Sequence, residues 1–363
     1  MKKIAFYLPQ FHTIPENDEW WGEGFTEWVN VKNSVPQFKN HIQPEVPLDK
    51  NYYCLLEDNI QRWQSDLAKE YGIDGFCYYH YWFEGKMLLE KPMEKMLANT
   101  EVTIPFCICW ANETWARTWD GQEENVLIKQ NYNENRAAWK KHFEYLLQFF
   151  LDDRYIKEKG KPLLLIYKPQ LISNCKDMVT YWNELAVEAG LDGIYVGCQH
   201  PSAYDVPLEE MGMDFGVEFE PFFTVRELNH ELNNKLKKIT HYILKPKIFF
   251  RKVEHKLLKK PNIYDYDEIW KRIIKRVPLN ENMMPGAFPS WDNTPRRSNT
   301  SDIFWGATPK KFKKYFHLQL EHANEEYQAE YIFINAWNEW AEGAHLEPDE
   351  HNKYGYLEAL KED

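Results

Sequence analysis

The chain has 363 residues, of which 44% are hydrophobic and 28% charged, and it carries a net charge of −12. This composition excludes a disordered chain, and the length fits one large α/β domain or two ordinary ones. The acidic balance argues against nucleic acid as the main partner, and no apolar run is long enough for a membrane span. The first apolar run turns polar after five residues, too short for a signal peptide, so we expect an unexported, cytoplasmic protein.

Eight short apolar runs alternate with stretches of helical periodicity. Continuous apolar strands that alternate with helices predict a parallel sheet covered by helices, and eight such units predict a single (β/α)8 barrel, also called a TIM barrel, over residues 1–363. An open, doubly wound sheet is the alternative, but no G-x-G-x-x-G motif follows the first run. We expect strands at residues 4–8, 75–79, 104–110, 162–167, 194–198, 215–219, 284–288 and 331–335. We expect helices where apolar residues recur three or four apart, within 56–67, 139–150, 178–189 and 312–327.

Two segments depart from this alternation. Residues 10–55 read as a long polar and aromatic loop, and residues 224–282 as a basic helical insertion between the sixth and seventh strands. Within residues 226–260, eleven Lys and Arg against three Glu give a net charge of +8. Basic helices that also carry apolar residues lie on anionic membrane surfaces, so peripheral membrane contact is one interpretation of this segment. A solvated helical hairpin that merely covers one side of the barrel is the favoured interpretation.

Polar and aromatic residues follow each expected strand, at the barrel end where (β/α)8 enzymes build their active sites. Aromatic rings stack on sugar rings, while amides, guanidinium groups and carboxylates bind hydroxyls. We therefore expect an oligosaccharide or polysaccharide substrate. For the residues around Trp110, the alternative is a core aromatic cluster with surface charges. The candidate substrate-binding residues are His12, Tyr81, Trp82, Trp110, Asn112, Glu113, Trp115, Lys168, Glu218, Glu220, Trp291, Asp292, Arg296, Trp337, Asn338 and His345.

The candidate catalytic residues are Glu339 and Glu342, just after the last expected strand. Two carboxylates three residues apart can point into one cleft if the chain turns helically there. Glycoside hydrolysis needs such a pair, one group with a raised pKa and one partner. The alternative is a capped helix with glutamates in its first turn.

Three further patterns have competing interpretations. Glu218 and Glu220 share one face of a strand, and either reach the barrel mouth or form structural salt bridges with Lys168 or Arg296. The sequence 265–267 matches the D-x-D of metal-dependent glycosyltransferases, but helix N-capping is the favoured interpretation. The cysteines lack a zinc-binding spacing and no H-E-x-x-H occurs, so we expect buried thiols, no metal and no cofactor.

Taken together, six segments resemble the WbsX-type family, whose members are often encoded among bacterial surface-polysaccharide genes and labelled glycosyltransferases. This family is in turn similar to glycoside hydrolase family 99, which comprises retaining endo-α-mannosidases and endo-mannanases on a (β/α)8 barrel. The resemblance spans nearly the whole chain. Its segments are residues 7–12, 24–28, 75–82, 109–113, 289–296 and 335–340.

The hydrolase family has the motif N-E-W-H-E-G where this chain has N-E-W-A-E-G at 338–343, so both carboxylates are kept and Ala341 replaces a histidine. The resemblance implies that Glu342 is the general acid/base. It implies that Glu339 deprotonates the sugar 2-hydroxyl, which attacks the anomeric carbon to give a 1,2-anhydro sugar. The change at Ala341 affects the expected sugar contacts.

The sequence therefore predicts a retaining, endo-acting glycoside hydrolase or transglycosylase. Its expected substrate is an α-linked bacterial surface polysaccharide, such as a mannan, or a precursor of one. A glycosyltransferase of O-antigen or capsular polysaccharide biosynthesis is one alternative, although no nucleotide-phosphate loop is found. A non-catalytic glycan-binding barrel is the other, and the retained carboxylate pair argues against it.

Overall fold

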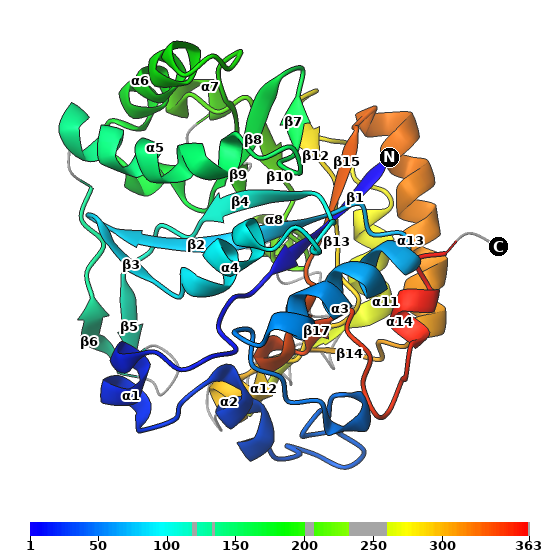
Figure 1. The fold of residues 1–363 in the computed structure, drawn as a ribbon. Coiled ribbons are helices and arrows are strands. Elements are labelled where there is room, and N and C mark those ends of the chain that lie inside the picture. Colours follow the sequence, from blue (N-terminus) through cyan, green and yellow to red (C-terminus); the bar gives the residue numbers. More distant parts are fainter. Residues whose placement is uncertain (118–121, 133–134, 200–206, 232–259, 362–363) are drawn as a thin grey trace.

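The computed structural model describes the chain except for residues 118–121, 133–134, 200–206, 232–259 and 362–363. Its centre is a sheet of nine short parallel strands that curls into a nearly closed barrel with helices around it (Figure 1). The predicted α/β barrel is therefore confirmed. The barrel strands are β1 (Lys2–Tyr7), β2 (Gly75–Phe83), β4 (Phe106–Trp110), β8 (Lys161–Ile166), β9 (Tyr195–Gln199), β10 (Phe215–Val217), β12 (Met283–Met284), β13 (Gly286–Ala287) and β15 (Tyr331–Ile334).

Nine strands arise from eight units because Pro285 interrupts the seventh expected strand. The part before the proline, β12, pairs with β10, and the part after it, β13, pairs with β15. Pro285 has no N–H to give to a sheet, but its carbonyl accepts a 3.0 Å hydrogen bond from Phe333. One bent strand thereby joins the two ends of the sheet.

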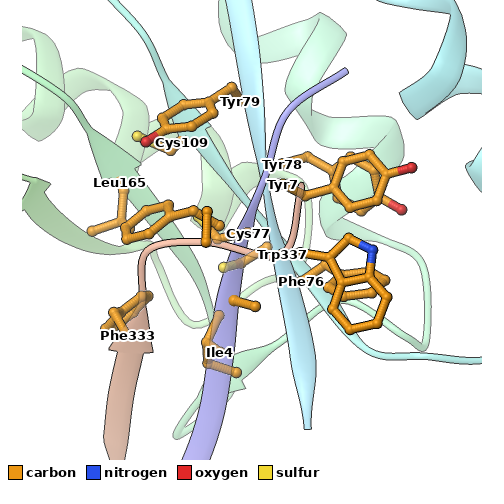
Figure 2. Packing of buried hydrophobic residues seen from close by; sticks show 14 of the residues in the cluster. Ile4, Tyr7, Phe76, Cys77, Tyr78, Tyr79, Cys109, Leu165, Phe333 and Trp337 are labelled. Atoms are coloured by element: carbon orange, nitrogen blue, oxygen red, sulfur yellow. The ribbon is translucent and has the colours of Figure 1, made fainter. Parts of the chain in front are cut away.

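Side chains on the barrel strands alternate between the interior and the helical layer. Phe6 points inward, where its ring lies 5.7 Å from that of Tyr79 and 5.3 Å from that of Phe219. Tyr7 points outward and donates a 2.6 Å hydrogen bond to Gln64 on a surrounding helix. Figure 2 shows Tyr79 and Tyr7 on opposite sides of the strands β1 and β2. The inward aromatic layer forms the floor of the cleft described below.

All four expected helices are present, the last continuing into a π-helical turn at Ala323–Tyr327. Asn135 and Thr308 cap two of them by accepting backbone N–H bonds from Ala138 (2.8 Å) and Lys311 (3.3 Å). The larger helices are α3 (Asp58–Glu70), α4 (Lys91–Ala98), α5 (Arg136–Phe150), α6 (Cys175–Glu188), α8 (Phe222–Glu231), α11 (Tyr266–Ile273) and α13 (Pro309–His322). The shortest are α7 (Leu208–Met211), α12 (Thr294–Arg297) and α14 (Gly355–Glu358). No helix in the described part of the chain has the length and hydropathy of a membrane span.

The prediction that residues 10–55 form only a loop is wrong. They contain α1 (Pro15–Trp21), α2 (Glu27–Asn33) and a 3-10 turn, η1 (Leu48–Lys50). Helices of seven residues show too few turns for an apolar period to be read from sequence. The segment positions α2 against the loop after β15, where Trp28 packs on Trp340 with ring centroids 5.5 Å apart.

The basic insertion is described only at its two flanks, α8 and α11, the second preceded by strand β11 (Asn262–Asp265). β11 pairs in parallel with β14 (Asp302–Trp305), outside the barrel. The predicted basic helices and most of their cations fall within 232–259, outside the described residues, so both remain predictions.

Candidate active site

A cleft of about 490 Å³ opens at the C-terminal ends of the barrel strands. Seven of the predicted site residues line it, from segments that follow β4, β13 and β15 and from the end of β2. Three aromatic rings, Tyr81, Trp115 and Trp291, face the same space as the two candidate catalytic carboxylates. The seven residues are Tyr81, Glu113, Trp115, Trp291, Arg296, Glu339 and Glu342.

The two carboxylates reach the cleft because the chain makes one tight turn between them. Glu339 ends the two-residue strand β16 (Asn338–Glu339), and Glu342 ends the 3-10 turn η6 (Trp340–Glu342). The return strand β17 (Ala344–His345) pairs antiparallel with β16. The alternative of a longer capped helix is therefore wrong.

Gly343 makes this turn possible in two ways. Its φ of +57° lies in the left-handed region, which favours glycine. A Cβ there would come within 2.9 Å of the backbone N and O of Asp292. The close approach lets the Asp292 N–H donate a 2.7 Å bond to the Glu342 carbonyl, which joins the loops after the seventh and eighth strands.

One guanidinium group, that of Arg296 on α12, holds both cleft carboxylates and a third from α2. Its Nη1 donates to Glu342 at 2.5 Å and its Nη2 to Glu339 at 3.2 Å, while Nε lies 3.3 Å from Glu27. The side chains of Arg296 and Glu27 are 10% and 0% exposed. Arg296 was predicted to bind substrate. In this structure it contacts the two carboxylates that would act on the substrate.

Burial sets the protonation of the pair. It raises the pKa of Glu339 to about 8, helped by the charge of Glu342 and opposed by Arg296. Burial also raises the pKa of Glu342, again against Arg296. The side chain of Glu339 is 8% exposed, whereas that of Glu342 is 22% exposed. Glu339 also makes the longer contact to the guanidinium group of Arg296. Burial therefore favours the protonated form of both groups more than it is favoured in an exposed glutamate, and Arg296 opposes this in both.

A buried carboxylate, Glu347, anchors this loop from outside the cleft. It accepts hydrogen bonds from the indoles of Trp337 (3.0 Å) and Trp340 (2.7 Å), and from Gln64 (2.7 Å) and Tyr53 (2.8 Å). Burial raises the pKa of Glu347 to about 7, and these donors oppose the rise. Trp337 was predicted to bind substrate, but it is buried and its polar edge is used in the core.

Asn338 is likewise structural rather than a cleft residue. Its side-chain amide accepts from the Leu8 N–H at 2.7 Å and donates to the Leu8 carbonyl at 3.0 Å. Asn338 is fully buried, and it joins the loop after the last strand to the end of the first. Asn338 was predicted to bind substrate, but it does not line the cleft.

Three other predicted residues lie outside the cleft. Asp292 is 2.6 Å from His41 and accepts a 2.8 Å bond from Gln43, so it joins the loop after β13 to the segment 10–55. His345 lies 3.4 Å from Glu45 beside a second cavity of about 610 Å³, and burial lowers its pKa to about 4. His12 is also buried, which lowers its pKa to about 4. None of the three faces the carboxylate pair.

The aromatic stretch after β4 divides between core and cleft. Trp110 is buried and donates to the Trp82 carbonyl at 3.3 Å, and Trp82 stacks on His142 with centroids 4.5 Å apart. For Trp82 and Trp110, the core-cluster alternative is therefore the correct one. Trp115 is half-buried and reaches the cleft, where its ring lies 5.0 Å from that of Tyr81. Residues 119 and 120 lie outside the described part of the chain.

Asn112 and Lys168 connect neighbouring strand ends behind Glu113. The Asn112 side chain accepts from the Lys168 N–H at 2.7 Å and donates to its carbonyl at 2.8 Å. The Lys168 ammonium forms an ion pair with Glu113. Asn112 and Lys168 do not line the cleft, so they hold Glu113 on its wall rather than contact a ligand there.

Glu218 and Glu220 form structural salt bridges, but neither predicted partner is correct. Arg276, which follows α11, lies 2.7 Å from each of them and also 2.7 Å from Glu227 on α8. Burial raises the pKa of Glu218 to about 7 and raises that of Glu220, and Arg276 opposes both shifts. Arg276 thus ties both flanks of the insertion to the sixth strand.

The D-x-D sequence is used for structure. Asp265 caps α11 by accepting the Glu268 N–H at 3.0 Å, as predicted, and Asp267 lies 2.6 Å from Lys311. Within the described residues, no group of three His, Cys, Asp or Glu side chains is arranged to hold a metal ion. Five of the six cysteines are buried as predicted, and Cys54 is half-buried.

Several residues in or beside the cleft were missed by the sequence analysis. Glu27, a buried partner of Arg296, stands in the segment 24–28 used for the resemblance, so a signal for it existed. Tyr79 and Tyr167 lie within or directly after strands β2 and β8, where an inward position depends on register. Arg226 and Arg297 also line the cleft, and nothing in their sequence neighbourhood distinguishes them from surface cations.

The fold is that of a glycoside-hydrolase-like barrel. Two solved structures of the family 99 endo-α-mannosidase from Bacteroides thetaiotaomicron are similar, with TM-scores of 0.56 and 0.55 at 14% identity. The matches cover 94% and 95% of those two chains and 99% of this chain. A structure described as a glycoside hydrolase-like protein gives a TM-score of 0.58 at 14% identity, covering 99% of this chain and 92% of that one.

Residues 3–360 match the family described as glycosyltransferase WbsX, and the chain belongs to that family. Two curated relatives, the uncharacterised WxcX proteins of two strains of Xanthomonas campestris pv. campestris, are 37% identical over 99% of this chain. The chain spans about half of their length, 49%.

Proposed function

We propose that this protein is a retaining, endo-acting glycoside hydrolase or transglycosylase for an α-linked bacterial surface polysaccharide or its precursor. The observation that carries the proposal is the pair Glu339 and Glu342, both in one cleft and both held by Arg296. A carboxylate pair with raised pKa values is what glycosidic bond cleavage requires. The aromatic rings on the same cleft suit stacking against sugar rings.

In the proposed first step, Glu339 takes the proton of the sugar 2-hydroxyl, whose oxygen attacks the anomeric carbon. The bond to the glycosidic oxygen breaks, and Glu342 gives that oxygen its proton. In the second step, Glu342 takes a proton from water, or from an acceptor sugar in transfer, and the new oxygen attacks the anomeric carbon. The 1,2-anhydro ring opens, Glu339 returns its proton to the 2-oxygen, and the starting configuration is retained.

These roles require Glu342 to be protonated and Glu339 to be ionised when the reaction begins, whereas burial raises the pKa of Glu339 to about 8. Both carboxylates contact Arg296, so moving the proton from one to the other leaves the total charge around the guanidinium unchanged. A glycosidic oxygen that accepts a hydrogen bond from Glu342 favours the protonated form of that group. Substrate binding would thus produce the reactive arrangement.

The test is incubation of the purified protein with bacterial surface polysaccharides, followed by mass spectrometry of the products. The proposal predicts internal cleavage into oligosaccharides, with a new reducing end that keeps its anomeric configuration. The Glu342→Gln protein is the control and should release no oligosaccharides above background. A parallel reaction with nucleotide sugars tests the glycosyltransferase alternative: sugar transfer from them, without glycan cleavage, would overturn the proposal. Binding of glycan with neither reaction would favour a binding module.

We also propose a cytoplasmic, membrane-peripheral location, supported by the net charge of +8 within residues 226–260. Sedimentation with anionic vesicles tests it. Salt-sensitive binding should disappear when Lys237, Lys238, Arg251 and Lys252 are replaced by Glu. Equal recovery in the supernatant with and without anionic lipid would contradict the proposal.

A further inference from the structure

Two guanidinium groups on the cleft have no side-chain partner among the residues that the structure describes. Arg226 on α8 and Arg297 on α12 both line the cleft, and neither makes a hydrogen bond or ion pair through its side chain within the described part of the chain. The other charged groups on the cleft are engaged. Arg296 bonds Glu339 and Glu342, Glu113 is paired with Lys168, and Asp302 accepts a 2.9 Å bond from Asn262.

Both cations lie close to the proposed reacting groups. Arg297 directly follows Arg296, and its charge acts on the carboxyl of Glu342, whose pKa it lowers against the raising effect of burial. Arg226 acts in the same sense on the hydroxyl of Tyr167, a cleft residue that also experiences the charge of Glu342. The two cations therefore line the same cleft as the carboxylate pair, and Arg297 directly follows the arginine that contacts both carboxylates.

An aromatic surface accompanies one of them. Phe222 lies one helical turn before Arg226 on α8, and both line the cleft. Its ring packs edge to face on Trp291, with centroids 4.7 Å apart. A sugar ring held against this aromatic pair would place its substituents within reach of a guanidinium one turn away.

We propose that the substrate is an acidic glycan, with a carboxylate or phosphate group on a sugar next to the cleaved bond, recognised by Arg226 and Arg297. This inference rests on the proposed function and adds the substrate class. Guanidinium groups match carboxylate and phosphate oxygens in two parallel hydrogen bonds, while a neutral sugar would leave both cations without a counter-ion.

A different explanation is that the two arginines only offset the acidic groups around them. In that case their removal would affect neutral and acidic ligands equally. The overall charge of −12 does not oppose an acidic ligand at this distance, because charges farther than about 8 Å are largely screened at physiological salt.

The experiment uses Glu342→Gln protein and calorimetric binding of three probes. They are hexuronate-containing oligosaccharides, the same oligosaccharides after reduction of their carboxyl groups to alcohols, and phosphorylated mannan oligosaccharides. We expect an acidic probe to bind at least tenfold more tightly than the reduced one, and less tightly as salt rises. Arg226→Gln and Arg297→Gln should each abolish most of this preference while leaving the weak binding of the reduced probe unchanged.

Arg62→Gln, which removes an exposed arginine of α3 paired with Glu101, is the matched control and should retain the preference. Melting temperatures show that each variant is folded. Preference for the phosphorylated probe over the hexuronate would identify phosphate as the group. Equal binding of acidic and reduced probes, equal losses for both in the variants, or no binding of any probe would overturn the inference. Cleavage of a neutral glycan by the wild type would support the proposed hydrolase function and contradict the inference that the substrate is acidic.

Discussion

The indole N–H of Trp340 donates a 2.7 Å hydrogen bond to the carboxylate of Glu347. Trp340 stands between the two cleft carboxylates in sequence, whereas Glu347 is 2% exposed and does not line the cleft. The loop that presents Glu339 and Glu342 is therefore fixed by a third carboxylate outside the cleft.

Glu347→Gln should destabilise the protein by about 1–3 kcal/mol, because an amide nitrogen cannot accept hydrogen bonds from the surrounding donors. The loop should also move, so turnover should fall even in folded protein. Tyr53→Phe removes one donor and is the milder comparison, with a loss of about 1–2 kcal/mol. Urea unfolding measures both. Equal stability of the Glu347→Gln protein and the wild type would contradict this role.

The pH dependence of stability follows from the buried carboxyls. The pKa values of Glu218 and Glu347 are raised to about 7 and that of Glu339 to about 8, so between pH 6.5 and 8 the folded state binds more protons than the unfolded state. Burial lowers the pKa values of His12, His80, His142 and His345, so these groups oppose the trend between pH 6.5 and 7, where unfolded histidine loses its proton, and have little effect above that. Stability should therefore fall as pH rises from 6.5 to 8, by on the order of 1 kcal/mol for each carboxyl near pKa 7.

Urea unfolding at pH 6.5, 7.2 and 8 measures this slope. Glu347→Gln should make it shallower, since that group no longer titrates. Stability that rises with pH over this interval would show that these carboxyls are ionised in the folded protein.

Gly343→Ala should abolish most activity and destabilise the protein by more than about 2 kcal/mol. The left-handed conformation costs a residue with a Cβ about 1–2 kcal/mol, and here the Cβ would also overlap the backbone of Asp292. Gly190→Ala is the matched control, because Gly190 also has a positive φ of +86° but no heavy atom within 4 Å of the added Cβ. Thermal unfolding compares the two; equal losses would mean that the contact with Asp292 has no effect.

Arg276→Met should destabilise the protein by about 3–5 kcal/mol, since it leaves the buried carboxylates of Glu218 and Glu220 without their cation. Arg272→Met removes the exposed ion pair between Arg272 of α11 and Glu231 of α8 and should cost less than about 1 kcal/mol. Denaturant unfolding distinguishes the two. A similar small loss in both would show that Glu218 and Glu220 are protonated in the folded state without needing Arg276.

The fold was predictable because parallel barrel strands are buried on both faces and read as continuous apolar runs. The eight runs are all strands, whereas the interruption at Pro285 and the short helices α1 and α2 are among the features that were missed. Those features depend on one residue or on seven-residue segments, which give too little periodicity to read.

The site was predictable where it is local in sequence. The spacing of Glu339 and Glu342 needs one turn, and the turn is there. Which way an aromatic side chain points was not predictable: Trp110 and Trp115 are five residues apart, yet one is in the core and the other on the cleft. Ion-pair partners distant in sequence could not be predicted either: Glu218 pairs with Arg276 rather than with Lys168 or Arg296.

The central claim is that Glu339 and Glu342 carry out glycan cleavage, and the most direct test is the cleavage rate of Glu342→Gln and Glu339→Gln proteins on a confirmed glycan. Each should lose roughly 10²–10⁴-fold in turnover while remaining folded, the usual contribution of a positioned acid or base. On a glycosyl fluoride, whose leaving group needs no proton, the Glu342→Gln protein should regain activity and the Glu339→Gln protein should not. Full activity of both variants on the natural glycan would contradict the account.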